Sequence, residues 1–335
     1  MRRPQHSLQR CHISARRMLR LLLLAQAAAA LAIAAGAWRW FNVSALVAVL
    51  LGAGMVVLMR LLINAHNFFL SHRSASVTPA EFRLNAGAGL RLFGEEFVAS
   101  MLQSSWSMPR AAPRQVIYPG ATCPPVPPVL LLHGYGCNSG YWAALTPLLD
   151  AARISHATLD LEPVTGDIDG YVPAVQRACE ALCAAAGAPK LIIVAHSMGG
   201  LVARAWLRVH GAHQVARVIT LGTPHHGTRL AGFGVGRNAA QMRRADIDTS
   251  PPTCAGDGLE NAWLGALAAG ESAQTRALIS SIYSHHDNIV SPQTSGLLEG
   301  ARNLAFGGVG HVALGRNRRV LACVMGEIAA AGGPA

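Results

Sequence analysis

Ser197 lies in a segment whose residue types fit a catalytic nucleophile. Residues 195–200 read AHSMGG and stand between an apolar run at 191–195 and a helical pattern at 201–209. A serine on a tight turn from strand to helix presents its hydroxyl above the sheet, and small residues such as Ala195 and Gly199 leave room for that turn. The first N–H groups of the following helix would face a developing oxyanion. The pattern predicts a nucleophile elbow, with Ala195 where glycine is usual.

A serine hydroxyl is a weak nucleophile unless a base lies beside it. On a sheet of this kind the expected chain order is serine, then acid, then histidine. Asp287 follows an apolar run at 279–283, and His311 ends the glycine-rich segment 307–311. We therefore predict a triad in which Asp287 orients His311 and His311 removes the proton of Ser197.

The oxyanion of an acyl-transfer intermediate needs two N–H donors. His133 and Gly134 directly follow an apolar run at 129–132 and precede Tyr135. We expect the backbone N–H groups of Tyr135 and Met198 to be these donors.

Other histidines and acids fit the triad less well. Some precede the serine or the acid in the chain, some are too close to Asp287 in sequence, and some belong to the elbow or the oxyanion loop. We expect these residues to shape the site or to be structural: His133, His196, His225, His226, His285, His286, Asp160 and Asp257.

The elements that must position this chemistry are short apolar strands. Strand-like runs alternate with helical patterns such as 171–186, which predicts an α/β fold with a central, mostly parallel sheet flanked by helices. Residues 129–335 would form this catalytic domain. The predicted strands are 129–132, 157–161, 191–195, 218–221, 279–283 and 303–306.

Two charge-free runs, at 21–38 and 40–59, precede this region. Each approaches the roughly 20 residues with which a helix spans a bilayer. We predict a transmembrane helical hairpin at 19–63 behind a basic arm at 1–18. A cleaved signal peptide or buried core helices are the alternatives.

Most of the arginines in this region lie at one end of the hairpin. Six precede the first run, Arg39 lies in the turn, and Arg60 and Arg73 follow the second run. The positive-inside rule then places both ends and the catalytic domain in the cytoplasm, as in a multi-pass protein of a bacterial inner membrane. Cleavage after the first run would invert this orientation. Residues 64–128 form a connector that ends in a proline-rich stretch.

The charge of the chain is concentrated before the catalytic region. The formal net charge is +11, but residues 1–75 hold nine arginines and no acid, which leaves +2 for residues 76–335. A basic segment beside apolar runs indicates contact with anionic lipid, and the nearly neutral remainder argues against a nucleic-acid partner.

The seven scattered cysteines suggest no disulfide framework. No metal, cofactor or protein partner is predicted.

Three blocks of the sequence resemble the small bacterial triacylglycerol lipases. These blocks are the elbow at 192–200, the acid segment at 281–290 and the histidine segment at 300–311. The resemblance implies an α/β-hydrolase fold, here preceded by two transmembrane helices, and cofactor-free hydrolysis of carboxylic esters, with acylglycerol-type lipids as substrates. A longer insertion at 229–270 could be a lid or a simple surface excursion.

Two other functions remain open at this point. A membrane-associated acyltransferase or thioesterase would use the same triad on related substrates. A catalytically inactive membrane scaffold would keep the fold without the chemistry.

Overall fold

The computed structural model describes residues 13–120, 126–244 and 261–332. In these residues a single sheet of seven strands has the order β1-β3-β2-β4-β5-β6-β7. β1 is antiparallel to β3, and all other neighbours are parallel. The strands are β1 Gln115–Val116, β2 Val129–Leu132, β3 His156–Leu159, β4 Leu191–His196, β5 Val215–Leu221, β6 Ile279–Ser284 and β7 Arg302–Phe306.

Helices cover both faces of this sheet. Leu130 and Leu132 of β2 pack in one cluster with helices α6 and α7, whereas Val129 and Leu131 pack in the other with α5 and α11. This alternation follows from the two-residue period of a strand, and burial on both faces explains why the strands are apolar throughout. These helices are α5 Thr146–Ala151, α6 Val172–Ala186, α7 Met198–His210 and α11 Arg318–Ala331.

The predicted α/β-hydrolase architecture, with a mostly parallel sheet between helices, is therefore confirmed, and the six predicted strands correspond to β2–β7. β1 was not predicted, because a two-residue edge strand is too short to show a period. The remaining described α-helices of the domain are α8 Arg237–Met242, α9 Ala262–Ala269 and α10 Ala273–Ala277. Part of the possible lid, residues 245–260, lies outside the described residues.

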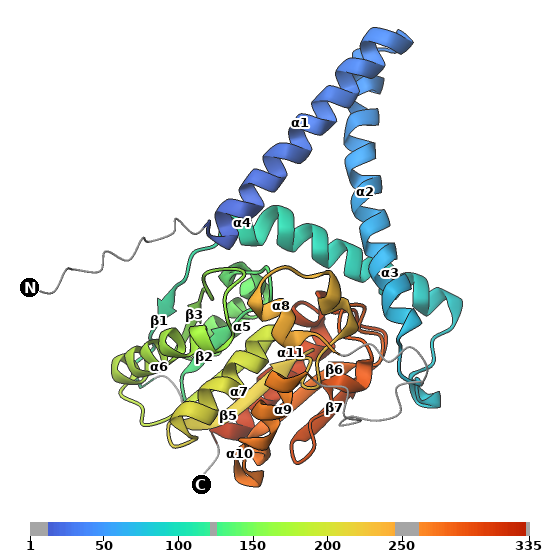
Figure 1. The fold of residues 1–335 in the computed structure, drawn as a ribbon. Helices are drawn as coiled ribbons and strands as arrows, with labels where there is room; N and C mark the ends of the chain where they lie inside the picture. Colours follow the sequence, from blue (N-terminus) through green and yellow to red (C-terminus); the bar gives the residue numbers. More distant parts are fainter. Residues whose placement is uncertain (1–12, 121–125, 245–260, 333–335) are drawn as a thin grey trace, which may run out of the picture.

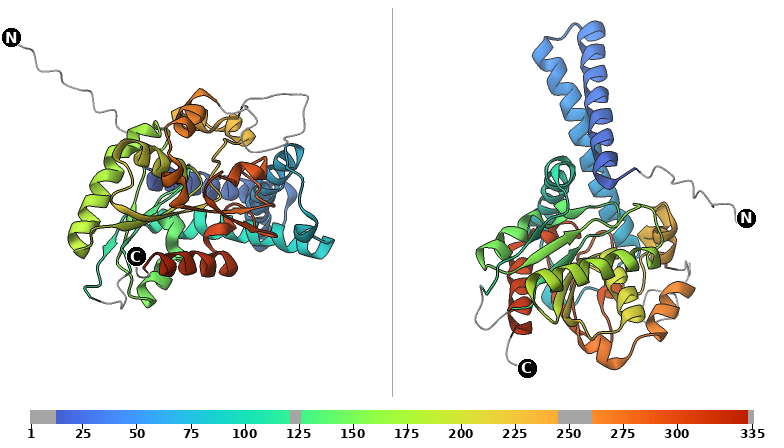
Figure 2. Two further views of the ribbon diagram at one scale, coloured as in Figure 1. Left: turned by 90° about the horizontal axis from the view of Figure 1, so that it is seen from below. Right: turned by 90° about the vertical axis from the view of Figure 1, so that its left-hand side faces the viewer.

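Two long helices, α1 (Ala15–Phe41) and α2 (Ala45–Arg73), form a hairpin that projects from the sheet domain (Figures 1 and 2). Ser14 and Ser44 cap their N-termini through side-chain oxygens. The helices touch where a Cβ at Gly52 would collide with the backbone oxygen of Ala30, so only glycine allows this close approach. Both helices are long and apolar enough to cross a membrane.

α2 continues to Arg73, so its last ten residues lie in the predicted connector. A loop then leads to α3 (Ala86–Leu102), which lies across the open end of the hairpin in Figure 1. A π-helical turn, Gln103–Ser107, and the short α4 (Met108–Arg110) extend α3 toward the base of α1. Ala99 of α3 packs in the cluster of α5 and α11, so this helix also belongs to the hydrolase core.

Candidate active site

Ser197 stands at the turn between β4 and α7. Its φ of 53° and ψ of −124° are unusual for a residue with a side chain, and such a conformation costs on the order of 1–3 kcal/mol. The Ser197 N–H donates to Leu221 O at 2.8 Å, and the hydroxyl of Thr223 donates to Ser197 O at 3.0 Å. The end of β5 therefore holds the strained turn in place.

Close backbone packing explains the small residues of the elbow. A Cβ at Gly199 would lie 2.6 Å from Leu132 O, and one at Gly134 would lie 2.9 Å from the Ser197 Cβ. Neither distance is compatible with a larger residue unless the backbone moves. Ala195, at the position where glycine is usual, is fully buried at the end of β4.

Asp287 and His311 are hydrogen-bonded to each other. The distance from His311 Nδ1 to Asp287 Oδ2 is 2.7 Å, and both residues are buried. The other oxygen of Asp287 accepts from the N–H groups of Ile289 and Val290, at 2.8 and 2.7 Å. The carboxylate is thus fixed in orientation and left with one oxygen for the imidazole.

The electrostatics of this pair favour a protonated imidazole. Burial by itself would lower the pKa of His311, but the charge of Asp287 and its hydrogen bond outweigh burial, so the pKa lies above its usual value. A histidine with this environment can accept a proton from a hydroxyl and hold the resulting charge.

The turn after β5 lies between the serine and the acid–histidine pair. Leu221 binds the Ser197 N–H, and a Cβ on the next residue, Gly222, would lie 3.1 Å from both Asp287 Oδ2 and His311 Nδ1. Among the described residues Ser197 Oγ has no hydrogen bond, so its contact with His311 is not formed here. Such contacts are often long in enzymes without substrate and tighten when substrate binds.

The predicted oxyanion donors lie in the expected elements. Met198 is the first residue of α7, and the first N–H groups of a helix have no acceptor within the helix. Tyr135 follows β2 and lines a cavity together with Ser197. Its hydroxyl exchanges hydrogen bonds with the Val235 backbone at 2.8 and 2.9 Å, which ties this loop to the segment before α8.

Most of the other histidines have structural partners in the fold. His133 Nε2 accepts from the Leu161 N–H, and His286 Nδ1 accepts from the Gly308 N–H. His225 is buried beside Arg204, whose guanidinium forms a 2.6 Å ion pair with Glu271.

His196 lies between two rings, stacked on Tyr141 at 3.9 Å and tilted toward His311 at 4.6 Å. Burial and the charge of His311 keep the pKa of His196 well below its usual value. A neutral His196 ring therefore supports one side of the His311 loop.

Two residues of the connector, which the sequence did not mark as functional, hold the acid and histidine loops. Glu96 accepts from the N–H groups of Val312 and Ala313, at 2.9 and 2.8 Å. Ser71, near the end of α2, donates its hydroxyl to Asp287 O at 2.8 Å. No local sequence signal could reveal these contacts, because the partners are more than 200 residues apart in the chain.

A cavity of about 360 Å³ opens beside Ser197, and most of its lining is apolar. Residues of the possible lid, 229–270, form part of the cavity lining, and residues of α2 form another part. The lining residues are His66, Asn67, Leu70, Tyr135, Ser197, Pro224, Thr228, Leu230, Ala231, Phe233, Gly234, Ala239, Met242, Ile289 and Val290. The cavity is large and apolar enough to bind an apolar group of a ligand next to the strained serine.

Comparisons with known proteins support the same fold. A family model described as the alpha/beta hydrolase fold matches residues 127–258. A pimeloyl-[acyl-carrier protein] methyl ester esterase of Aromatoleum aromaticum is 35% identical over 102 residues, which are 29% of this chain. The matched segment spans only 37% of that relative's length.

Solved structures of a Bacillus licheniformis lipase have the same fold. The mature form gives a TM-score of 0.51 at 19% identity, over 65% of this chain and 98% of that chain. The propeptide form gives 0.50 at 20% identity, over 65% and 53%. The strand order, the family match over 127–258 and these structures together show that this chain contains a domain with the α/β-hydrolase fold.

Proposed function

We propose that this protein hydrolyses carboxylic esters, with Ser197 as nucleophile, His311 as base and Asp287 orienting the base. The observation that carries the proposal is the buried 2.7 Å hydrogen bond between His311 and Asp287. These residues follow β7 and β6, and Ser197 follows β4, so all three lie at the carboxyl edge of one parallel sheet.

The proposed reaction has two acyl-transfer steps. His311 removes the Ser197 proton while Oγ attacks the ester carbonyl carbon, and the N–H groups of Tyr135 and Met198 hold the resulting oxyanion. The tetrahedral intermediate expels the alcohol, which takes the proton from His311. A water molecule, deprotonated by His311, then hydrolyses the acyl-enzyme and frees Ser197.

Lipids with long acyl chains are the proposed substrates, as in the small bacterial triacylglycerol lipases that the motifs resemble. The apolar cavity beside Ser197 supports this substrate class, because burial against apolar side chains stabilises a bound acyl chain more than a polar substituent. Leu70 of α2 lines the cavity, so a helix of the proposed anchor also shapes the substrate site. Acylglycerol-type esters are the substrates to test first.

The hairpin of α1 and α2 is proposed to anchor the protein in a bacterial inner membrane. Large apolar side chains on both helices are uncovered, with Leu24 66% exposed and Leu50 61% exposed. Lipid tails would cover these side chains. Under the positive-inside rule, the arginines before the first apolar run and after the second favour a cytoplasmic position for the hydrolase domain.

Labelling with a fluorophosphonate probe tests the nucleophile. The full chain in detergent should label, and Ser197→Ala should neither label nor hydrolyse p-nitrophenyl acyl esters, with a loss of roughly 10⁴-fold or more. Ser272→Ala removes only the side-chain cap of α10 and should keep both activities. Full ester hydrolysis by Ser197→Ala would disprove the assignment.

A further inference from the structure

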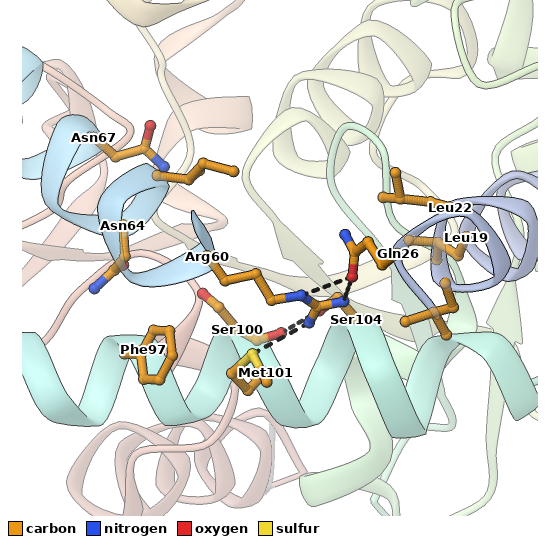
Figure 3. A pocket seen from close by; sticks show the side chains of 12 residues that line it. Leu19, Leu22, Gln26, Arg60, Asn64, Asn67, Phe97, Ser100, Met101 and Ser104 are labelled. Carbon is orange, nitrogen blue, oxygen red and sulfur yellow. Dashed lines mark hydrogen bonds between the residues drawn. The ribbon is translucent and has the colours of Figure 1, made fainter. Parts of the chain in front are cut away.

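A second cavity, of about 210 Å³, lies where α1, α2 and α3 meet (Figure 3). One part of its lining is apolar and another part is polar, as in a site for an amphiphile. The lining residues are Leu19, Leu22, Leu23, Gln26, Arg60, Ile63, Asn64, Asn67, Phe97, Ser100, Met101 and Ser104. The active-site chemistry proposed above uses none of them.

Arg60 is the charged group of this cavity, and it reaches from α2 toward α1 in Figure 3. Its Nε and Nη2 donate to Gln26 Oε1 at 3.0 and 2.5 Å. Its Nη1 donates to Ser105 Oγ at 2.7 Å, to Ser104 Oγ at 3.2 Å and to Met101 Sδ at 3.2 Å. Every one of these partners is neutral.

The guanidinium therefore has fixed hydrogen bonds but no counter-charge from the described residues. Across 13–120, 126–244 and 261–332, no carboxylate forms an ion pair with Arg60 within 4.0 Å. A cation close to lipid tails is costly unless an anion compensates it. The neutral partners orient the guanidinium but do not neutralise its charge. An anionic ligand would supply the compensating negative charge.

The position of Arg60 along α2 points to the kind of anion. Arg60 directly follows the charge-free run 40–59, so in the proposed anchor it lies where the apolar span ends. Lipid phosphates lie at this depth, and the remaining N–H of Nη2 can donate one charge-assisted hydrogen bond to a phosphate oxygen. Leu19, Leu22 and Leu23 of α1 offer an apolar wall beside it for the lipid's chains.

We propose that this cavity binds the phosphate group of an anionic glycerophospholipid, with Arg60 as its main ligand. The proposal rests on the membrane placement put forward above, but not on the catalytic assignment. Asn67 lines both this cavity and the one beside Ser197. The two cavities therefore share Asn67 as part of their walls.

Native mass spectrometry of the full chain in detergent micelles tests this site without measuring catalysis. The Ser197→Ala background prevents hydrolysis, and the probes are phosphatidylglycerol and a diacylglycerol with the same chains. The chain should retain phosphatidylglycerol in preference to the diacylglycerol. Arg60→Gln should lower the retained fraction by roughly tenfold, the loss of one charge-assisted contact. Inorganic phosphate should not displace the lipid, because it lacks the chains that fill the apolar wall.

Arg20→Gln is the matched control for charge. Arg20 lies near the base of α1, donates to Pro109 O at 2.8 Å and does not line the cavity. This variant should retain phosphatidylglycerol like the parent chain. An equal loss in Arg20→Gln would mean general attraction to anionic lipid and would overturn the site, as would full retention by Arg60→Gln or equal retention of the diacylglycerol.

A second variant separates lipid binding from damage to the helix contacts. Leu22→Trp keeps every hydrogen bond of Arg60 and fills the cavity from α1. It should also lower retention of phosphatidylglycerol, and unchanged retention would refute the proposal. If lipid retention fails while the fluorophosphonate probe still labels Ser197 in the parent chain, the lipid site at Arg60 is disproved and the catalytic assignment is not.

Discussion

Glu96 of α3 accepts a hydrogen bond of 2.8 Å from the backbone N–H of Ala313, two residues after His311. Its other oxygen binds the Val312 N–H, and a Cβ at Gly310 would lie 2.5 Å from the carboxylate. A helix from the segment before the hydrolase domain is thus packed directly against the histidine loop. Burial raises the pKa of Glu96 to about 6, although the two N–H donors oppose this shift.

Glu96→Gln should loosen the histidine loop. An amide has one acceptor oxygen for two buried N–H groups, and leaving one unsatisfied costs about 1–3 kcal/mol. The charge of Glu96 also raises the pKa of His311, so its removal should move the acid limb of kcat/KM to lower pH. Denaturant unfolding and a pH–rate profile measure the two effects. Glu95→Gln changes the neighbouring residue, whose side chain accepts from Asn317 and from no other described residue, and should leave the acid limb in place.

The pH dependence of ester hydrolysis should follow His311. The base must be neutral to accept the serine proton, and its pKa lies above the usual value of about 6.5. The value of kcat/KM should therefore fall as the pH decreases through a pKa higher than 6.5. In Asp287→Asn the residual activity should have its acid limb at lower pH, because the charge and the hydrogen bond of Asp287 no longer oppose the effect of burial on the pKa of His311. An acid limb that stays in place in this variant would contradict the pairing.

Leu70→Trp should shorten the proposed acyl site from the side of α2. The indole would occupy part of the cavity beside Ser197, so kcat/KM for long-chain p-nitrophenyl esters should fall by roughly 10–100-fold while acetate hydrolysis changes little. Phe69→Trp alters the adjacent, exposed residue, which does not line the cavity, and should behave like the parent chain. Equal losses on short and long esters would show that Leu70 does not limit chain length.

The ion pair of Arg204 and Glu271 should matter for stability. Both side chains are at most 1% exposed, and Arg204→Met would leave the buried carboxylate with Arg276 as its one ion-pair partner in the described part of the chain. Removal of one partner of a buried pair typically costs about 3–5 kcal/mol. Arg302→Met breaks the pair with Glu327, in which the arginine is 62% exposed, and should cost less than about 1 kcal/mol. Equilibrium unfolding in urea compares the two variants.

The sheet and the elbow could be read from the sequence because their signals are local. An apolar run between turn residues predicts a buried strand, and the segment 195–200 carries the small residues that a tight turn needs. The end of the second helix has no such local signal, because its composition becomes more polar after Ile63 while the helix continues. The helix continues to Arg73, and Asn64 donates its amide to Phe93 O at 3.4 Å, within the protein.

The sequence by itself determined the α/β fold, the position of Ser197 and the presence of two long apolar helices. Only the tertiary structure decided that the end of α2, through Ser71, and α3, through Glu96, hold the proposed catalytic loops. It also decided that Asp287 and His311 lie within a hydrogen bond of each other. The reason is that such contacts join residues far apart in the chain. Their partners depend on how the helices and strands pack, and the local hydrophobic periodicity of the sequence does not reveal this packing.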